Sequence, residues 1–193
     1  HIKLGGKLQD VTAMFADLEG FTSISEHTGP EELLNVLNRY HDLLVRFVLA
    51  EAGTVDKFMG DAVMALYNTP LEQSNHVERA VRTALAIHAE LPEFHQQFEP
   101  KFRMPINIGI NTGSAIVGNV GSEQIMDFTA VGDTVNVASR LQTQGENGQI
   151  LISQAVRDVL SEDYLSEPIG ALVVKNRANA VTTHILKGRS DHA

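Results

Sequence analysis

Two aspartates stand where apolar runs of strand length meet a turn. Asp17 ends the run VTAMFADL, and Asp61 follows Gly60 between TVDKF and AVMALY. In a β-α-β-β order the first strand commonly neighbours the following hairpin, so both carboxylates are expected at one sheet edge. Paired carboxylates bind hard divalent cations, and two such ions can clamp the attacking and leaving oxygens of a phosphoryl transfer. The plainer interpretation is that each is a turn residue, a position that Asp favours.

The loop after Asp17 carries a second candidate, formed by Gly20, Phe21 and Thr22 directly before an expected helix. A glycine there lets backbone N–H groups approach an anion closely, and a helix N-terminus adds a favourable potential. Taken alone, the same stretch could equally be an ordinary loop that Phe21 anchors.

Four further polar residues stand in apolar surroundings. Asn136 and Arg140 are four apart in an expected helix and share one face. The planar donors of Arg140 could stabilise a phosphate as charge develops on it, or pair with a carboxylate. Lys57 only donates hydrogen bonds, whereas Thr129 carries a hydroxyl. The plain alternatives are a surface lysine and an ordinary β-branched strand residue.

The elements that must position these residues follow from the hydrophobic pattern. Helices are expected over Pro30 to about residue 50, Asn75 to Phe98 with a bend or end at Pro92, 132–144 with Asp133 or Thr134 as its cap, and Gln154–Leu160. Strands are expected over 11–18, 54–58, 62–67, 105–113, 114–121, 127–131 and 148–153, followed by a hairpin over 170–186. This order predicts an α+β fold: a ferredoxin-like βαββαβ core with additional C-terminal strands and a short helix.

Composition limits the classes of function. The 193 residues are 43% hydrophobic and 20% charged, as in one globular domain. We expect a cytoplasmic protein, because no apolar run could cross a membrane and no signal-peptide pattern opens the chain. The absence of cysteine excludes disulfides and thiolate chemistry. A net charge of −9 argues against nucleic-acid binding, although metal ions would let an acidic protein bind a small polyanion.

Four stretches together, in this order, resemble the class III nucleotidyl cyclase catalytic domain. They are FADLEGFTSISE (15–26), VDKFMGDAVMALY (55–67), INIGINTGSAIVGNVGS (106–122) and FTAVGDTVNVASRLQ (128–142). The likeness runs from about Val11 to Leu186. It implies a catalytic domain over 11–188, with 1–10 as a linker remnant and 189–193 as a tail. His1 and the short stretch before Val11 also lead us to expect an upstream regulatory domain in the full-length protein.

The resemblance implies a role for each candidate residue. Asp17 and Asp61 would hold two Mg²⁺ or Mn²⁺ ions, with the Leu18 carbonyl as a further ligand. The triphosphate would bind the amides of Gly20, Phe21 and Thr22. Asn136 would orient the ribose, and Arg140 would stabilise the transition state. Lys175 would contact the terminal phosphates, although the usual Lys-Gly of the family is Lys175-Asn176 here.

The two base-reading positions of the resemblance fall on Lys57 and Thr129. A lysine donates to adenine N1, and a threonine hydroxyl can accept from the adenine amino group. Guanine presents a donor at N1 and an acceptor at C6, so the pair favours ATP. Many members carry Asp in place of Thr129. Threonine marks the subgroup that includes bicarbonate-responsive adenylyl cyclases, which makes bicarbonate a candidate activator.

The resemblance implies an adenylate cyclase that converts ATP to 3′,5′-cyclic AMP and pyrophosphate, with sites shared across a head-to-tail homodimer. A guanylate cyclase is the nearest alternative, but such members usually carry Glu at position 57. A catalytically silent nucleotide-binding regulatory domain usually lacks a metal-binding Asp or the Asn/Arg pair, and all four residues are present here. The Gly-Gly-(Asp/Glu)-(Asp/Glu)-Phe hairpin of diguanylate cyclases is absent.

Overall fold

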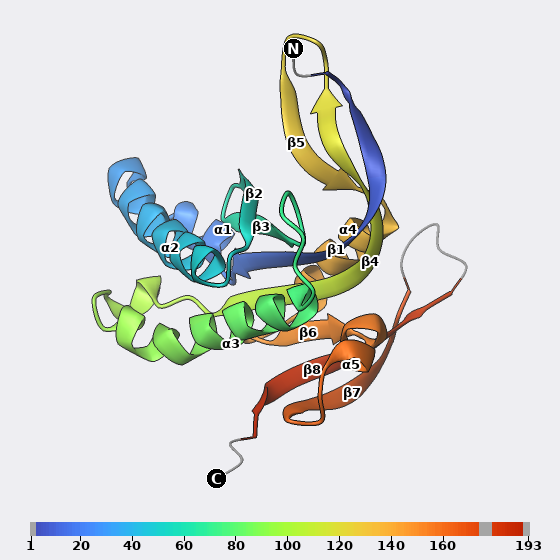
Figure 1. Cartoon of the computed structure of the whole chain (residues 1–193). Coiled ribbons are helices and arrows are strands. Elements are labelled where there is room, and N and C mark those ends of the chain that lie inside the picture. Colours follow the sequence, from blue (N-terminus) through green and yellow to red (C-terminus); the bar gives the residue numbers. More distant parts are fainter. Residues whose placement is uncertain (1–2, 174–178, 191–193) are drawn as a thin grey trace.

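The computed structural model describes residues 3–173 and 179–190 and has one eight-stranded sheet with helices on both faces (Figure 1). The strands are β1 Gly5–Leu18, β2 Thr54–Met59, β3 Ala62–Tyr67, β4 Ile106–Gly121, β5 Met126–Val131, β6 Ile150–Ser153, β7 Tyr164–Leu172 and β8 Val181–Arg189. The helices are α1 Phe21–Ser25, α2 Pro30–Ala50, α3 His76–His95, α4 Asp133–Gln144 and α5 Gln154–Val159, with a 3₁₀ turn over Pro100–Phe102. None of the helices in these described ranges is long and apolar enough to cross a bilayer.

The strand order is β2-β3-β1-β4-β6-β8-β7, and β5 pairs with β4 outside this path. The first four strands of the order are antiparallel neighbours and form the ferredoxin-like core that the sequence predicted. The parallel pairing of β6 with β4 then adds the C-terminal strands. The α+β prediction is therefore confirmed.

Alternate residues of β1 serve two hydrophobic cores. Met14 and Ala16 pack with α2 and α3 on one face, whereas Ala13 and Phe15 pack with α4 on the other. This period of two is the geometry of a strand that is covered on both sides. It also explains why the run over 11–16 is apolar except at Thr12, since all of these residues are buried and the Thr12 hydroxyl donates to Thr112.

Two strand predictions are wrong. β1 begins at Gly5, so residues 5–10, which were assigned to a linker, pair with β4; they are mostly exposed and give no hydrophobic signal. The two strands expected over 105–113 and 114–121 are one strand, β4. The expected break at Gly113 does not occur because β1 pairs across it, with Val11 opposite Gly113 and Asp10 opposite Ser114.

Two helix predictions also need correction. Of the bend or end expected at Pro92, the end does not occur: α3 continues through Pro92 and stops at His95, before the expected bound at Phe98. Neither Asp133 nor Thr134 caps α4: its N-cap is Gly132, without a side-chain hydrogen bond. The Thr134 hydroxyl instead donates to the Ser114 carbonyl oxygen at 2.6 Å and ties the start of the helix to β4.

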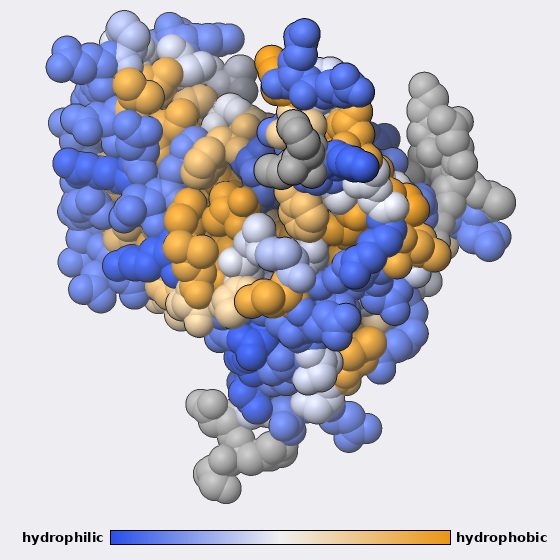
Figure 2. Space-filling model, turned by 45° about the horizontal axis from the view of Figure 1, so that its top comes forward, coloured by the Kyte–Doolittle hydropathy of each residue, from blue (hydrophilic) through white to orange (hydrophobic). Residues whose placement is uncertain are grey.

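A three-stranded arm projects from the sheet, formed by the first half of β1, the second half of β4 and β5 (Figure 1). Its exposed large apolar side chains include Leu8, Ile116, Val120, Phe128 and Val131. Figure 2, in which the top of the molecule comes forward, shows apolar side chains gathered across the middle of this face. An apolar surface of this kind is typical of a protein–protein contact.

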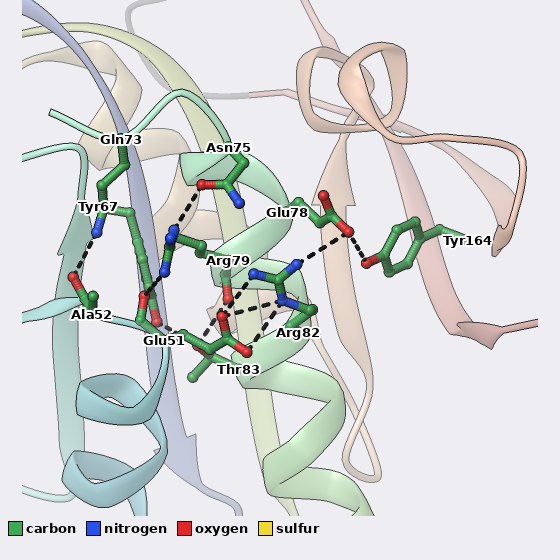
Figure 3. Close-up of polar contacts among 10 residues, drawn as sticks. All are labelled: Glu51, Ala52, Tyr67, Gln73, Asn75, Glu78, Arg79, Arg82, Thr83 and Tyr164. Carbon is green, nitrogen blue, oxygen red and sulfur yellow. Dashed lines mark hydrogen bonds and ion pairs between the residues drawn. The ribbon is translucent and has the colours of Figure 1, made fainter.

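A polar network joins the core to the C-terminal strands (Figure 3). Arg82 of α3 binds the Glu51 carboxylate through two nitrogens, the shortest contact being 2.9 Å, and lies 3.2 Å from Glu78. The hydroxyl of Tyr164, at the start of β7, donates to Glu78 at 2.8 Å. Charged and bidentate hydrogen bonds of this type are stronger than neutral ones, so the network fixes β7 against α3.

Gly109 lies where α4 crosses β4, and we expect Gly109→Ala to destabilise the protein by about 2 kcal/mol or more. A Cβ there would lie 2.3 Å from the Gln142 nitrogen and 2.4 Å from the Ala138 oxygen, both backbone atoms of α4. The measurement is chemical denaturation. Gly29→Ala is the matched control, because Gly29 has an extended backbone and nothing within 4 Å of such a Cβ. Equal stabilities for the two variants would contradict this packing.

Candidate active site

The carboxylates of Asp17 and Asp61 lie at the same edge of the sheet. β1 and β3 are paired up to Ala16 and Val63, and Asp61 lies in the two-residue turn just before β3. Gly60 has a φ of 61° in that turn, which a residue without Cβ adopts at no steric cost. Burial raises the pKa of Asp17 and the charge of Asp61 raises it further, while a hydrogen bond from Gln142 opposes the rise. The pair is thus electrostatically coupled.

This pair has the chemistry of a site for a hard cation. Two half-buried carboxylates that repel each other gain stability when a cation lies between them. The Leu18 side chain is in the core, so only its backbone carbonyl could serve as a ligand. Within the described ranges no group of three or more His, Asp or Glu side chains is placed to hold a metal ion. Few protein ligands suit Mg²⁺, which keeps waters and binds substrate phosphates.

The loop between β1 and α1 lies next to Asp17. Gly20 has a φ of 81° and is the exposed N-cap of α1, and a Cβ on it would meet nothing within 4 Å. The side chain of Phe21 is partly buried against the core of α2 and α3, so it anchors the loop. The Thr22 side chain is exposed. The backbone at this position is therefore open to a ligand from outside.

The second group of polar residues lines a cleft of about 320 Å³ between β2, β5 and α4. Its lining includes the apolar Phe15, Met64, Ala130 and Val135, and the polar Lys57, Asp127, Thr129, Asn136 and Ser139. An apolar floor with a few convergent polar groups is the usual composition of a small-molecule site. The structure thus brings together Lys57, Thr129 and Asn136, three of the residues that the sequence singled out.

Asp17, Asp61 and Arg140 do not line this cleft, as far as the described residues go. Arg140 is exposed on α4, one turn beyond Asn136. Neither the Asn136 nor the Arg140 side chain has a hydrogen bond or ion pair to another described residue. Lys175 lies outside the described residues. A single chain therefore presents two separate groups of polar residues. The guanidinium of Arg140 is available to a ligand or to another protein chain.

Sequence reasoning missed Asp56, which the structure places beside the cleft. Its side chain is only 1% exposed, and its carboxylate accepts a hydrogen bond from the Thr129 hydroxyl. Lys57 Nζ lies 3.8 Å from Asp56 Oδ1. Burial raises the pKa of Asp56, and the contacts with Thr129 and Lys57 oppose that rise. No signal in the sequence separates this aspartate from an ordinary strand-edge carboxylate.

Sequence reasoning also missed Gln142, two residues after Arg140, whose side chain binds Asp17. Gln142 is 8% exposed, and its backbone contacts Gly109. The helix that carries Asn136 and Arg140 therefore also contacts Asp17, near the C-terminal end of the helix.

Comparison with known protein families identifies the family of this chain: residues 6–188 match "Adenylate and Guanylate cyclase catalytic domain". The chain belongs to this family. Cyclase catalytic domains generally depend on Mg²⁺ or Mn²⁺, in agreement with the chemistry of the carboxylate pair.

Individual relatives within the cyclase family include both chemistries. "Adenylate cyclase 1" of Rhizobium meliloti (strain 1021) is 39% identical over 93% of this chain, which spans 28% of that protein. The adenylyl cyclase CyaB from P. aeruginosa has a TM-score of 0.91 at 32% identity, covering 97% of this chain and 98% of that one. The guanylyl cyclase Cya2 has a TM-score of 0.90 at 31% identity, covering 98% and 97%. Overall similarity therefore does not distinguish adenine from guanine as the substrate base, and the distinction rests on the residues of the site.

The coupled carboxylates predict that Asp17→Asn raises the melting temperature of the metal-free protein at pH 7. Because the folded state raises the pKa of Asp17, it holds this proton more tightly than the unfolded chain does. Wild-type stability therefore falls as the pH rises from the ordinary pKa through the raised one. The variant lacks this loss, so its advantage should shrink as the pH is lowered through the raised pKa.

The measurement is thermal denaturation with a chelator and then with Mn²⁺. Mn²⁺ should raise the melting temperature of the wild type, by mass action on the folded state, but not that of Asp17→Asn. Asp42→Asn, an exposed carboxylate of α2, is the control and should behave as the wild type does. Equal stabilisation of all three proteins by Mn²⁺ would contradict the assignment of the cation to this pair.

Proposed function

We propose that this domain is an adenylate cyclase, which forms 3′,5′-cyclic AMP and pyrophosphate from ATP in sites shared by two copies of the chain. The observation that carries the proposal is the cleft that joins Lys57, Thr129 and Asn136 but whose lining includes neither Asp17 nor Asp61. A nucleotide bound in that cleft needs metal ligands from elsewhere, and a second copy offers them.

The base follows from the hydrogen-bonding character of the cleft. The ammonium group of Lys57 can only donate, which suits N1 of adenine and opposes the N1–H of guanine. The Thr129 hydroxyl already donates to Asp56, so its lone pairs are available to the adenine amino group. A site built to match such groups discriminates strongly against the wrong pattern. The alternative of a guanylate cyclase requires an acceptor at position 57.

The remaining residues take the phosphates and the ribose. Asp17, Asp61 and the Leu18 carbonyl would hold two Mg²⁺ or Mn²⁺ ions, which lower the pKa of the ribose 3′-hydroxyl and stabilise phosphate charge. The backbone of Gly20, Phe21 and Thr22 faces the triphosphate, and Asn136 orients the ribose. In the reaction the 3′-oxygen bonds to the α-phosphorus, the bond to pyrophosphate breaks, and the hydroxyl proton passes to solvent.

Arg140 completes the reacting centre. Its exposed guanidinium, without a partner among the described residues, suits the charge that develops on the α-phosphoryl oxygens. Removal of one preorganised donor of this kind typically costs roughly 10²–10³ in rate. In a head-to-tail homodimer with two equivalent sites, Arg140 and Asn136 of one copy face Asp17 and Asp61 of the other. The apolar arm described above gives such a dimer a contact surface.

The test of the activity is incubation with ATP or GTP and either Mg²⁺ or Mn²⁺, scoring the cyclic nucleotide, with bicarbonate added in a parallel series. We expect cyclic AMP from ATP and little cyclic GMP from GTP. Lys57→Glu should lower the ATP to GTP ratio of kcat/KM by at least about tenfold, because the carboxylate accepts from guanine N1–H. Cyclic GMP as the main wild-type product, or an unchanged ratio in the variant, would refute this base assignment.

The shared site predicts complementation between two inactive variants. Asp17→Ala and Arg140→Ala homodimers should each lose about 10² or more of the wild-type rate. In a mixed dimer one site receives an intact Asp17 and an intact Arg140, so mixing should restore up to about a quarter of the wild-type rate if the chains pair at random. Chromatography of differently tagged chains verifies that mixed dimers form. Mixed dimers without activity would show that each site lies within one chain.

A further inference from the structure

A third carboxylate, that of Asp56, is buried beside the base-reading residues. Only 1% of its side chain is exposed, although its backbone lies on an edge strand. It accepts a hydrogen bond from the Thr129 hydroxyl, 73 residues away, and lies 3.8 Å from the ammonium of Lys57. Burial of a carboxylate is costly unless hydrogen bonds and a counter-charge compensate. Asp56 therefore occupies a site that an apolar residue would fill at less cost.

A β-bulge in β2 brings this carboxylate to the cleft. Val55 pairs with Ala65 and Lys57 pairs with Met64, so Asp56 is the extra residue of the bulge. Val55 packs with α2 and α3, whereas Met64 belongs to the core under α4. Regular alternation would place Asp56 and Lys57 on opposite faces; the bulge places both on the face of the cleft.

We propose that Asp56 is a positioning residue for base selection, which holds the Thr129 hydroxyl as a hydrogen-bond acceptor toward the 6-amino group of a purine. The inference rests on the proposed function, since it concerns how the same cleft chooses ATP. It assigns Asp56 no contact with the nucleotide.

Asp56 can orient the Thr129 hydroxyl because a hydroxyl has one proton to donate, whereas a carboxylate has none. An ionised Asp56 can only accept, so the Thr129 proton points to Asp56 and the oxygen lone pairs remain for the cleft. A 6-amino purine donates to these lone pairs. A 6-oxo purine, such as guanine or hypoxanthine, presents a further acceptor. The purine O6 and the Thr129 hydroxyl oxygen would then face each other with no proton between them. Such an unmatched buried pair is disfavoured by about tenfold or more.

An asparagine at position 56 would no longer fix the direction of the hydrogen bond with Thr129. Its amide carries both an acceptor and a donor, so the amide NH₂ can donate to Thr129 and release the hydroxyl proton toward the cleft. Asp56→Asn keeps the volume and a hydrogen bond to Thr129 but permits either polarity. The expected consequence is a loss of base selectivity rather than a loss of all activity.

The experiment compares kcat/KM of the full chain for three triphosphates: ATP, inosine triphosphate, which has a 6-oxo group, and purine riboside triphosphate, which lacks any 6-substituent. Thr129→Val should lower the preference for ATP over purine riboside triphosphate by about tenfold. Asp56→Asn should lower the preference for ATP over inosine triphosphate by about tenfold, mainly through better use of inosine triphosphate. In the Thr129→Val background, Asp56→Asn should change neither ratio by more than about twofold.

Asp42→Asn is the matched loss of a carboxylate outside the cleft and should leave both ratios unchanged. Asp56→Ala is a second variant, in which the Thr129 hydroxyl is free to rotate and the ATP preference should fall in the same way. Equal loss of activity toward all three triphosphates in both Asp56 variants would show that Asp56 only anchors the bulge, and this overturns the inference. Absence of cyclic AMP from the wild type, or unchanged ratios in Thr129→Val, would instead refute the proposed base reading.

Discussion

The pairing of β1 with β3 on one side and β4 on the other positions both groups of functional residues. Its end brings Asp17 to the turn that carries Asp61, and its middle supplies Phe15 to the floor of the cleft. Its first half extends the ladder with β4 into the apolar arm. Because side chains alternate along a strand, a shift of one residue in this register would move Asp17 and Phe15 to the opposite face. The register of β1 is therefore a requirement of the site as well as of the fold.

Burying the carboxylates of the site in their ionised form costs free energy in the isolated chain, and the way in which this cost is offset indicates what each carboxylate does. Burial and mutual repulsion raise the pKa of Asp17, and burial raises that of Asp56. The two differ in how the cost is offset. Thr129 and Lys57 compensate Asp56 within the chain, whereas Asp17 has only the hydrogen bond from Gln142 against the charge of Asp61. A carboxylate compensated internally suits a positioning role, and a pair left uncompensated suits a cation.

The parts of the fold that could be predicted are those with a hydrophobic period. The helix over Pro30–Ala50, the hairpin at Gly60-Asp61 and the α+β order all followed from it. The first residues of β1 could not be predicted, because an exposed antiparallel arm has no buried face to produce a pattern. The unbroken β4 was missed for another reason: glycine marks a turn in local reasoning, and the ladder with β1 that carries it through Gly113 is a long-range contact.

The same division holds for the site. Asp17 and Asp61 could be joined from the sequence because adjacent strands in a common topology bring strand ends together. Lys57, Thr129 and Asn136 line one cleft of the structure, whereas their roles remain proposals. Asp56 was out of reach because it depends on a bulge, which changes the side-chain alternation by one residue and leaves no mark in composition or period.

The hairpin of β2 and β3 then has a consequence for how the two halves of a dimer site depend on each other. Lys57 lines the cleft and Asp56 lies beside it, whereas Asp61, at the tip of the same hairpin, belongs to the carboxylate pair. In a head-to-tail dimer these residues would serve different active sites although they share one short hairpin. The hairpin is anchored to α2 by Phe58, which stacks on His41 with ring centroids 4.4 Å apart. A change in the tilt of this hairpin would alter base contacts in one site and metal ligands in the other. In such a homodimer the hairpin would therefore couple the two sites directly, without a pathway through distant residues.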